Sequence, residues 1–447
     1  MTWMTPQAAV FFPPSMPGSP AGMETIPKIL ARAGIQKAIH VKVVPFAETG
    51  VLQVKEEALK PCRYFDLETA EEIPDGDLRY ARWLASYYFN KPESQILQSE
   101  FQTEFDKYYP WVNRLLPIYK LRFDSGLVAY IHTETSSLAT VGSELKNFQQ
   151  NLFLNLHNFA WLENAFWGRF LLMALLVTSL LGMSASGLIL LLQFKHRRKM
   201  QRSRRGHRVL AYVLVLPLLG FTVSGLGRLL MNNFGGTERK PRLPEAETFD
   251  YAKMSGLPPD FHIHGPFSSI SLLRYQNQYY FRLAKAGGKQ EEHVHVEKKF
   301  SGTPAEKEDR ILTVSGETAG VLEVELARDR LKQVWPQAKI LSEKKILSFG
   351  PYYDFRNKRL PVWQFELASP GPELVYVDPA TGIIVDQLRG IDKAEALLFG
   401  TIHKWNAVVP WIGRTARDVL ILLVVLGAFG LMAFGVRLAV KRRRAGA

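Results

Sequence analysis

Three long apolar segments constrain this chain more than any other feature. Uncharged runs extend from Phe170 to Leu192 and from Val209 to Gly227, and a third run extends from Val419 to Val436. Roughly 20 apolar residues in a helix cross a bilayer, and a helix satisfies its own backbone hydrogen bonds there. The sequence therefore predicts a polytopic membrane protein, with helices over 166–194, 209–230 and 417–440.

The distribution of charge orients these helices. The formal net charge is +14, and most of the excess lies in two short basic runs, the loop 195–208 and the segment from Arg437 to the C-terminus. Each run adjoins an apolar segment, which is the pattern of cytoplasmic loops. We therefore predict that the loop 195–208 and the tail 441–447 face the cytoplasm. Basic runs in this position favour membrane lipids as the partner and argue against nucleic acid.

This orientation places two large polar segments, 24–165 and 231–416, on the outer side of the membrane. Residues 1–23 have no basic start and only a short apolar run, so they predict a disordered leader remnant and not a signal peptide. Export of segment 24–165 requires a preceding signal, and the hypothesis is that a first membrane helix is missing. The single cysteine, Cys62, allows no internal disulfide and predicts a partly buried, unreactive thiol.

The two external segments contain an internal repeat. Residues 108–124 ("YYPWVNRLLPIYKLRFD") and 352–367 ("YYDFRNKRLPVWQFEL") both have a Tyr-Tyr pair, then Arg-Leu and a proline before an alternating stretch. Strand-like segments follow in both, and Tyr130 precedes His157 by 27 residues, as Tyr376 precedes His403. The repeated order and spacing predict two copies of one structural unit.

The elements predicted for each external segment are helices and antiparallel strands. Residues 24–46 predict a helix and then a strand, 63–89 a strand, turn and helix, and 320–347 a helix and then a strand. Residues 374–388 predict a β-hairpin whose turn is "DPATG". The fold class is thus a helical transmembrane bundle with two α+β external domains, in which helices cover sheet faces.

These motifs resemble a known bacterial family. The hairpin, the following histidine ("LNLHNF", "GTIHKW") and the segment "GHRVLAYVLVLPLLGFTVSG" resemble the PepSY-associated transmembrane proteins over residues 24–440. The resemblance implies an inner-membrane protein with two periplasmic PepSY-type domains and a cytoplasmic C-terminus. It also implies four membrane helices, the first bearing a histidine, and a role in iron acquisition, with haem b between the helices and a ferric siderophore as substrate.

The histidines give this interpretation candidate ligands. His157 and His403 occupy equivalent repeat positions on the outer side and predict the two axial ligands of an outer haem. Because both lie well before their spans, the chain must fold back, and Gly168, Pro410 and Gly413 are the expected break points. His207 and His196 lie by the basic loop and predict an inner haem. For each pair, the alternative is a structural or lipid-facing histidine.

A second kind of site is predicted from two His-x-His pairs. A strand places residues i and i+2 on one face, where they can ligate a metal, and the alternative is a solvated strand face. These candidate metal ligands are His262, His264, His293 and His295. The Tyr-Tyr pairs at 108–109 and 352–353 predict either a chelate-binding groove or core packing.

Missing motifs narrow the function. The chain has no G-x-G-x-x-G opening a helix after a strand and no Walker loop, so no NAD, flavin or nucleotide site is predicted. The leading interpretation is haem-linked electron transfer to a ferric siderophore, supplied by quinol or a separate reductase. The alternative is a non-enzymatic PepSY membrane protein that binds a peptidase, a metal or a chelate.

Overall fold

A computed structural model describes residues 8–10, 12–16, 22–193, 202–235, 241–254, 266–285, 309–320, 322–368 and 371–445. The chain forms two compact units. The helical unit comprises Asn151–Glu238 and Arg389–Ala447, with Met1. The sheet unit comprises Thr2–Gln150 and Arg239–Leu388. Within the described residues the fold is mixed α+β, with antiparallel sheets and three helices that are long and apolar enough to cross a membrane.

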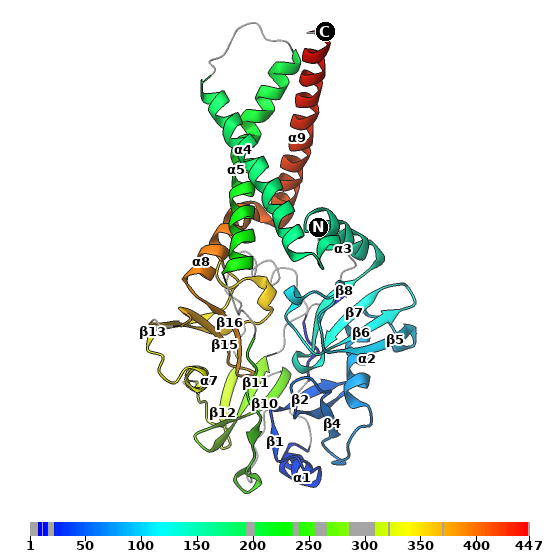
Figure 1. Ribbon diagram of the computed structural model, residues 1–447. Coiled ribbons are helices and arrows are strands. Elements are labelled where there is room, and N and C mark those ends of the chain that lie inside the picture. Colours follow the sequence, from blue (N-terminus) through cyan, green and yellow to red (C-terminus); the bar gives the residue numbers. More distant parts are fainter. Residues whose placement is uncertain are drawn as a thin grey trace. The chain divides into compact units, whose positions relative to one another are not determined.

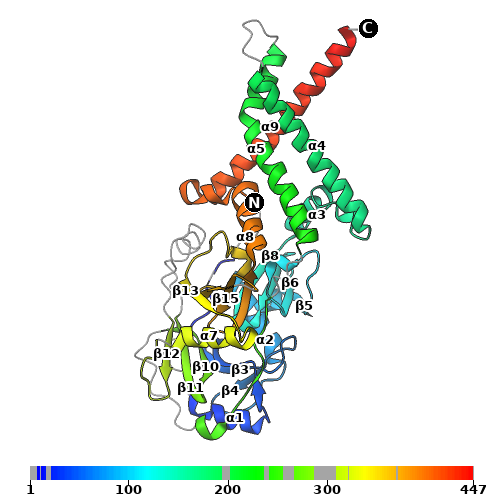
Figure 2. The same cartoon turned by 60° about the vertical axis from the view of Figure 1, so that its left-hand side comes forward.

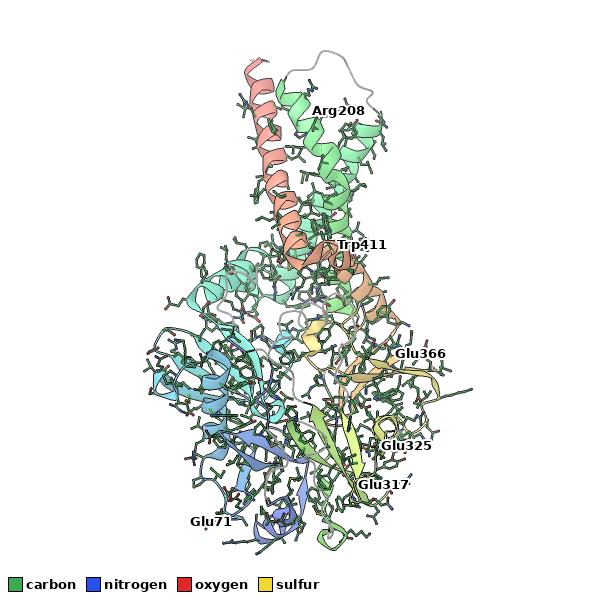
Figure 3. All side chains as sticks on the ribbon, turned by 180° about the vertical axis from the view of Figure 1, so that it is seen from behind. Glu71, Arg208, Glu317, Glu325, Glu366 and Trp411 are labelled. Atoms are coloured by element: carbon green, nitrogen blue, oxygen red, sulfur yellow. The ribbon has the colours of Figure 1, made fainter. Side chains whose placement is uncertain are left out.

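The helical unit is built on these three helices, α4 (Phe166–Gln193), α5 (Arg202–Phe234) and α9 (Val409–Ala445). Helix α5 packs against both α4 and α9, and Figure 1 shows the three side by side. Arg208 and Trp411 lie toward opposite ends of this unit (Figure 3). The predicted spans are confirmed as helices, but α5 and α9 extend further at both ends than the sequence indicated.

The sheet unit contains two four-stranded antiparallel sheets with the same strand order. The first follows the order β5 (Ile96–Gln102), β6 (Ile118–Phe123), β7 (Val128–His132) and β8 (Ser137–Gly142). The second follows the order β13 (Ile340–Ile346), β14 (Val362–Leu367), β15 (Leu374–Asp378) and β16 (Ile383–Leu388). We call residues 96–169 the first copy and residues 340–415 the second copy.

Matching details extend down to single side chains. Tyr109 stacks on Tyr130 at a ring-centroid distance of 4.9 Å, and Tyr353 stacks on Tyr376 at 4.6 Å. The Tyr109 hydroxyl donates to the Leu115 carbonyl, and the Tyr353 hydroxyl donates to the equivalent carbonyl of Arg359. The repeat predicted from spacing therefore corresponds to one packing scheme used twice. Tyr109 and Tyr353 are buried core residues.

A third sheet joins the two halves of the sheet unit. Strands β2 (His40–Phe46), β3 (Thr49–Lys55) and β4 (Arg63–Asp66) come from the first external segment. Strands β10 (Phe267–Tyr275), β11 (Gln278–Lys285) and β12 (Arg310–Thr313) come from the second. The order is β12-β11-β10-β2-β3-β4, with Val43 opposite Ile270 at the central junction. Figure 2 labels β12, β11, β10, β3 and β4 of this sheet. The segments predicted as separate domains thus share one continuous sheet.

Helices cover these sheets with one apolar face each. Helix α1 (Ile26–Arg32) buries Ile26, Ile29 and Leu30 in the core of the six-stranded sheet. Helix α2 (Gly76–Phe89) buries Tyr80, Leu84 and Tyr88, spaced by four residues, against the first four-stranded sheet. Helix α7 (Leu322–Val334) buries Ala327 and Leu331 against the second. The helices and strands predicted over 24–46, 63–89 and 320–347 are confirmed. A two-stranded pair, β1 (Lys37–Ala38) and β9 (Glu247–Thr248), completes the sheets.

The interpretation of residues 1–23 as a disordered leader is wrong for the part that the structure describes. The amide of Ala9 donates to the carbonyl of Tyr88 at 2.8 Å, and Met16 bridges to Phe267. Ala8, Phe12 and Met16 are buried. Met16 and Ala8 belong to two of the buried apolar clusters of the sheet unit, which a short apolar run in the sequence does not reveal. Cys62 is also buried, and burial raises the pKa of its thiol.

Candidate functional site

Each copy ends in the same sequence of turns before its membrane helix. In the first copy, α3 (Glu144–Leu156) ends one residue before His157, and Phe159 turns the chain with a φ of 50°. In the second copy, α8 (Gly390–Leu397) continues as a π-helical segment, η11 (Leu398–His403), and Trp405 turns the chain with a φ of 52°. Non-glycine residues rarely adopt this left-handed conformation, so its recurrence marks equivalent positions.

The expected fold-back is confirmed, but of the three expected break points only Gly413 was predicted correctly, because Pro410 lies in the helical start of α9. Gly413 leaves the helical conformation inside α9, with a φ of 74°. Gly168, by contrast, lies within the regular helix α4. The turn in the first copy occurs at Phe159, followed by the short 3-10 helix η6 (Ala160–Leu162). An aromatic residue in this conformation carries no sequence signal that would have located the turn.

The fold-back brings His157 and His403 together within the helical unit. Their ring centroids lie 6.3 Å apart, and the ring planes are inclined by 53°. Each ring stacks on a phenylalanine four residues earlier, His157 on Phe153 and His403 on Phe399, both at 4.8 Å. Stacking covers a ring face and leaves the in-plane nitrogen atoms free to bind. The repeated Phe-x-x-x-His spacing is visible in the sequence and could have singled out both phenylalanines.

The ring separation would allow His157 and His403 to hold one haem iron, which would supply a redox couple there. Imidazole nitrogens that bind a metal from opposite sides at about 2 Å each place their ring centres roughly 6 Å apart. Partial desolvation lowers the pKa of His157, although the residue is exposed. Burial, followed by the proximity of His157, lowers the pKa of His403 to about 4. Both rings are therefore neutral near pH 7, which is the protonation state that ligates metals.

Helix α5 holds the second copy's histidine through its small residues. Leu398 packs over Gly227, where an added Cβ would lie 2.6 Å from its Cδ2, and Ile402 packs over Gly220 at 3.1 Å. The Ser224 hydroxyl lies 3.1 Å from His403 Nδ1. The small residues in this span thus permit the close approach of neighbouring helical segments.

Charge also holds η11 and α8 against α5. Arg228 of α5 pairs with Glu395 of α8, and its guanidinium lies 4.0 Å from the Phe399 ring centroid. Phe399 in turn stacks on His403, so the ion pair and the histidine share one packed cluster. Sequence reasoning missed Ser224, Arg228 and Glu395, because they are close to the histidine only in three dimensions.

The predicted inner site has one described member. His207 lies near the start of α5, and its Nδ1 atom is buried without a hydrogen-bond partner among the described residues. A Cβ added to Gly435 on α9 would lie 3.8 Å from His207 Cε1. The ring therefore lies beside a residue of α9 that has no side chain. A nitrogen that binds a metal has no hydrogen-bond partner within the protein, so this position of His207 is compatible with a role as a ligand. His196 lies outside the described residues, so the pairing at the inner end stays a prediction.

The predicted metal ligands His262, His264, His293 and His295 also lie outside the described residues. Within the ranges given above, no group of three or more His, Cys, Asp or Glu side chains is placed to hold a metal ion. The His157–His403 pair is thus the candidate that the described structure assembles from the predicted site residues.

A small cavity lies between the two copies in the sheet unit. It measures about 30 Å³, and its lining includes Arg114, Glu134, Asn357 and Arg359. Arg114 faces Asp386 at 3.5 Å, and Arg359 pairs with Asp378 at 2.9 Å. This volume holds about two waters and is far below the roughly 300 Å³ or more of a typical ligand pocket. The cavity therefore does not hold a chelate.

No protein-family model, curated protein or solved structure matches this chain. The geometry of the helical unit is therefore the main guide to its function.

Proposed function

We propose that this protein is a bacterial inner-membrane protein that uses haem b to carry electrons to a ferric chelate on the periplasmic side. The observation that supports the proposal most strongly is the approach of His157 and His403. They come from equivalent positions of the two copies, and their rings are 6.3 Å apart. This separation is close to the spacing that two imidazoles on one iron would need.

The chain's own residues would serve this function by ligation and positioning. His157 and His403 would bind an outer haem through neutral imidazole nitrogens, while Phe153 and Phe399 would fix the ring planes. Haem, when bound, supplies a one-electron couple and the protein tunes it. His207, with its unpartnered buried nitrogen, would ligate an inner haem, and His196 is the proposed second ligand there.

Substrate and electron donor follow from separate arguments. The family resemblance supports a ferric siderophore, which is too large for the small cavity described in the sheet unit. No nucleotide-binding motif occurs in the chain. The donor would therefore be quinol or a separate reductase. Basic residues beside the spans support a cytoplasmic C-terminus and periplasmic placement of the sheet unit.

Visible spectroscopy tests this function. The full chain, purified in mild detergent from cells supplied with haem, should give sharp reduced-minus-oxidised bands of a bis-histidine haem. His157→Ala and His403→Ala should each remove the outer haem's contribution. Asn155→Ala and Thr401→Ala provide matched controls, because each lies two residues before a ligand, at equivalent positions of the two copies, and neither is buried. Both controls should retain the wild-type spectrum.

The outcomes separate the candidate functions. Loss of the bands in both histidine variants, together with reduction of an added ferric siderophore by the wild type, would establish the reductase. A colourless wild type would rule out the haem function. It would favour the non-enzymatic alternative, in which the protein binds a peptidase, a metal or a chelate. Retention of haem in His157→Ala would show that the outer site does not use this pair.

A further inference from the structure

Two groups of α5 contact the ring of His403, the Ser224 hydroxyl and the Phe221 backbone. Ser224 lies on α5 and is fully buried, with 0% of its surface exposed. Its Oγ atom lies 2.6 Å from the Gly220 carbonyl oxygen and 3.2 Å from the Phe221 carbonyl oxygen. A carbonyl oxygen can only accept, and a serine hydroxyl has one proton to donate. That proton is therefore directed at the helix backbone.

The remaining contact of Ser224 is with His403. Since the hydroxyl proton points to the Gly220 carbonyl, the Oγ atom can only accept in its 3.1 Å contact with His403 Nδ1. An acceptor at Nδ1 requires a proton on Nδ1. A neutral imidazole has one N–H, so Nε2 keeps its lone pair. The buried hydroxyl thus selects the tautomer that presents Nε2 as a ligand.

We propose that Ser224 is a positioning residue that fixes His403 as the Nδ1–H tautomer and strengthens Nε2 as an axial ligand. The tautomer follows from the hydrogen bonds alone, whereas its effect on haem rests on the proposed function. Donation from Nδ1–H raises the basicity of the opposite nitrogen, as partners outside the ligand sphere do at other metal sites. A more basic ligand favours ferric over ferrous iron, so Ser224 lowers the reduction potential.

The two copies differ in this respect. Among the described residues, no hydrogen bond reaches the imidazole ring of His157, which is held by stacking on Phe153. His403 has both a stacked phenylalanine and the Ser224 hydroxyl. The pair therefore has one ligand fixed in its tautomer and one that is free to adopt either. Removing Ser224 should reduce this difference between the two ligands, while the backbone hydrogen bond of His403 with Phe221 remains.

Thr222 supplies a matched control for Ser224. It lies on the same helix, is 7% exposed, and its hydroxyl donates to the carbonyl one turn earlier, that of Leu218, at 2.9 Å. Ser224→Ala and Thr222→Ala therefore both remove a hydroxyl bonded to the α5 backbone, but only the first removes a partner of His403. Ser224→Thr keeps the hydroxyl and should behave like the wild type.

The first measurement is the potentiometric titration of the haem in the purified full chain. Ser224→Ala should weaken ferric haem relative to ferrous haem about tenfold, which corresponds to an upward shift of about 59 mV for one electron. Thr222→Ala and Ser224→Thr should stay close to the wild-type potential. Equal potentials in Ser224→Ala and Thr222→Ala would overturn the proposed effect on the haem.

The second measurement needs no haem and separates the two proposals. Nitrogen-15 spectra of histidine-labelled, haem-free protein report the tautomer of His403, which is assigned with His403→Gln. The wild type should show an unprotonated Nε2, and Ser224→Ala should show a larger fraction with Nε2 protonated. A wild-type His403 protonated on Nε2 overturns the inference. If the protein never binds haem, the proposed function fails, and this spectrum alone decides the role of Ser224.

Discussion

The two copies differ most where the strands give way to the histidine-bearing helices. Positions 246 residues apart correspond there, so Leu152 matches Leu398 and Leu156 matches Ile402. In the second copy these side chains pack on the glycines of α5. In the first copy, Leu152 and Leu156 are 48% and 68% exposed. Equal sequence patterns thus have unequal surroundings, and the second copy holds its histidine more firmly.

In the strand regions the two copies contact each other directly, and both contribute side chains to the contact. Arg114 of the first copy faces Asp386 of the second, and Lys358 of the second donates to Asn113 Oδ1 of the first at 3.1 Å. Arg114 and Lys358 occupy equivalent left-handed positions, with φ values of 58° and 57°. The repeat therefore supplies a reciprocal contact between copies, in which each contributes one cation.

The largest expected effect comes from breaking this reciprocal contact. The side chains of Arg114 and Asp386 are only 3% and 0% exposed. Asp386→Ala would leave a buried cation without its carboxylate and should lower the free energy of unfolding by about 3–5 kcal/mol. The control is Thr140→Ala, at the equivalent position of the first copy, with an expected loss of about 1 kcal/mol or less. Thermal unfolding of the detergent-solubilised chain measures both. Similar losses would mean that the contact between copies adds nothing.

A smaller effect should follow from filling the contact between η11 and α5. A Cβ at Gly227 would lie 2.6 Å from Leu398 Cδ2, so Gly227→Ala forces Leu398 to move. Overpacking of this kind costs about 1–3 kcal/mol. Gly182→Ala on α4 is the control, because no atom lies within 4 Å of its added Cβ. Melting temperatures of the two variants should differ clearly. If both tolerate alanine equally, η11 does not pack on α5 as described.

The first copy has a histidine, His132, where the second copy has an aspartate, Asp378. This histidine should make the free energy of unfolding depend on pH. His132 is 1% exposed, and burial, reinforced by Arg359, Lys55, Lys42 and His40, lowers its pKa well below the usual value. Below about pH 6.5 the unfolded chain binds a proton at this histidine and the folded chain does not. Stability should therefore fall by up to about 1.4 kcal/mol per pH unit as the pH drops from about 6.5 toward the folded pKa.

His132→Asn removes this titration while keeping a polar partner for Thr135, which contacts His132 Nδ1 at 2.7 Å. Its unfolding free energy between about pH 6.5 and 5 should vary less steeply than that of the wild type, by up to one bound proton. Unfolding midpoints across this range measure the slope. An unchanged slope would show that His132 does not account for the acid sensitivity.

The smallest losses of stability are expected for two equivalent tyrosines, Tyr109 and Tyr353, and the two losses should be nearly equal. Tyr109→Phe and Tyr353→Phe each remove one buried hydroxyl-to-carbonyl bond, of 2.7 and 2.8 Å. Each should cost about 1 kcal/mol. Tyr352→Phe, at a half-buried neighbour, should cost less than about 0.5 kcal/mol. Thermal unfolding compares the three. A difference between Tyr109→Phe and Tyr353→Phe of more than about 1 kcal/mol would show that the two copies do not share one packing scheme.

Local patterns in the amino-acid sequence determined much of this protein by themselves. The apolar runs predicted α4, α5 and α9, because crossing a bilayer imposes a minimum length of uncharged helix. Strand alternation and the "DPATG" turn predicted β15 and β16, where Asp378 accepts hydrogen bonds from Ala380 and Thr381 within the turn. Spacing alone paired His157 with His403 as equivalent residues. Each of these features can be read from the order and spacing of residues along the chain, without knowledge of contacts in space.

Only the tertiary structure decided how the equivalent parts meet. The pairing of β2 with β10, the left-handed turn at Phe159 and the burial of Met16 have no local signal. Nor does the contact between Ser224 and His403, which lie 179 residues apart. These contacts arise because apolar faces must be buried together and each buried polar group must find a partner. Sequence periodicity specifies which face of a helix or strand is apolar. Packing of the whole chain decides which other element lies against that face.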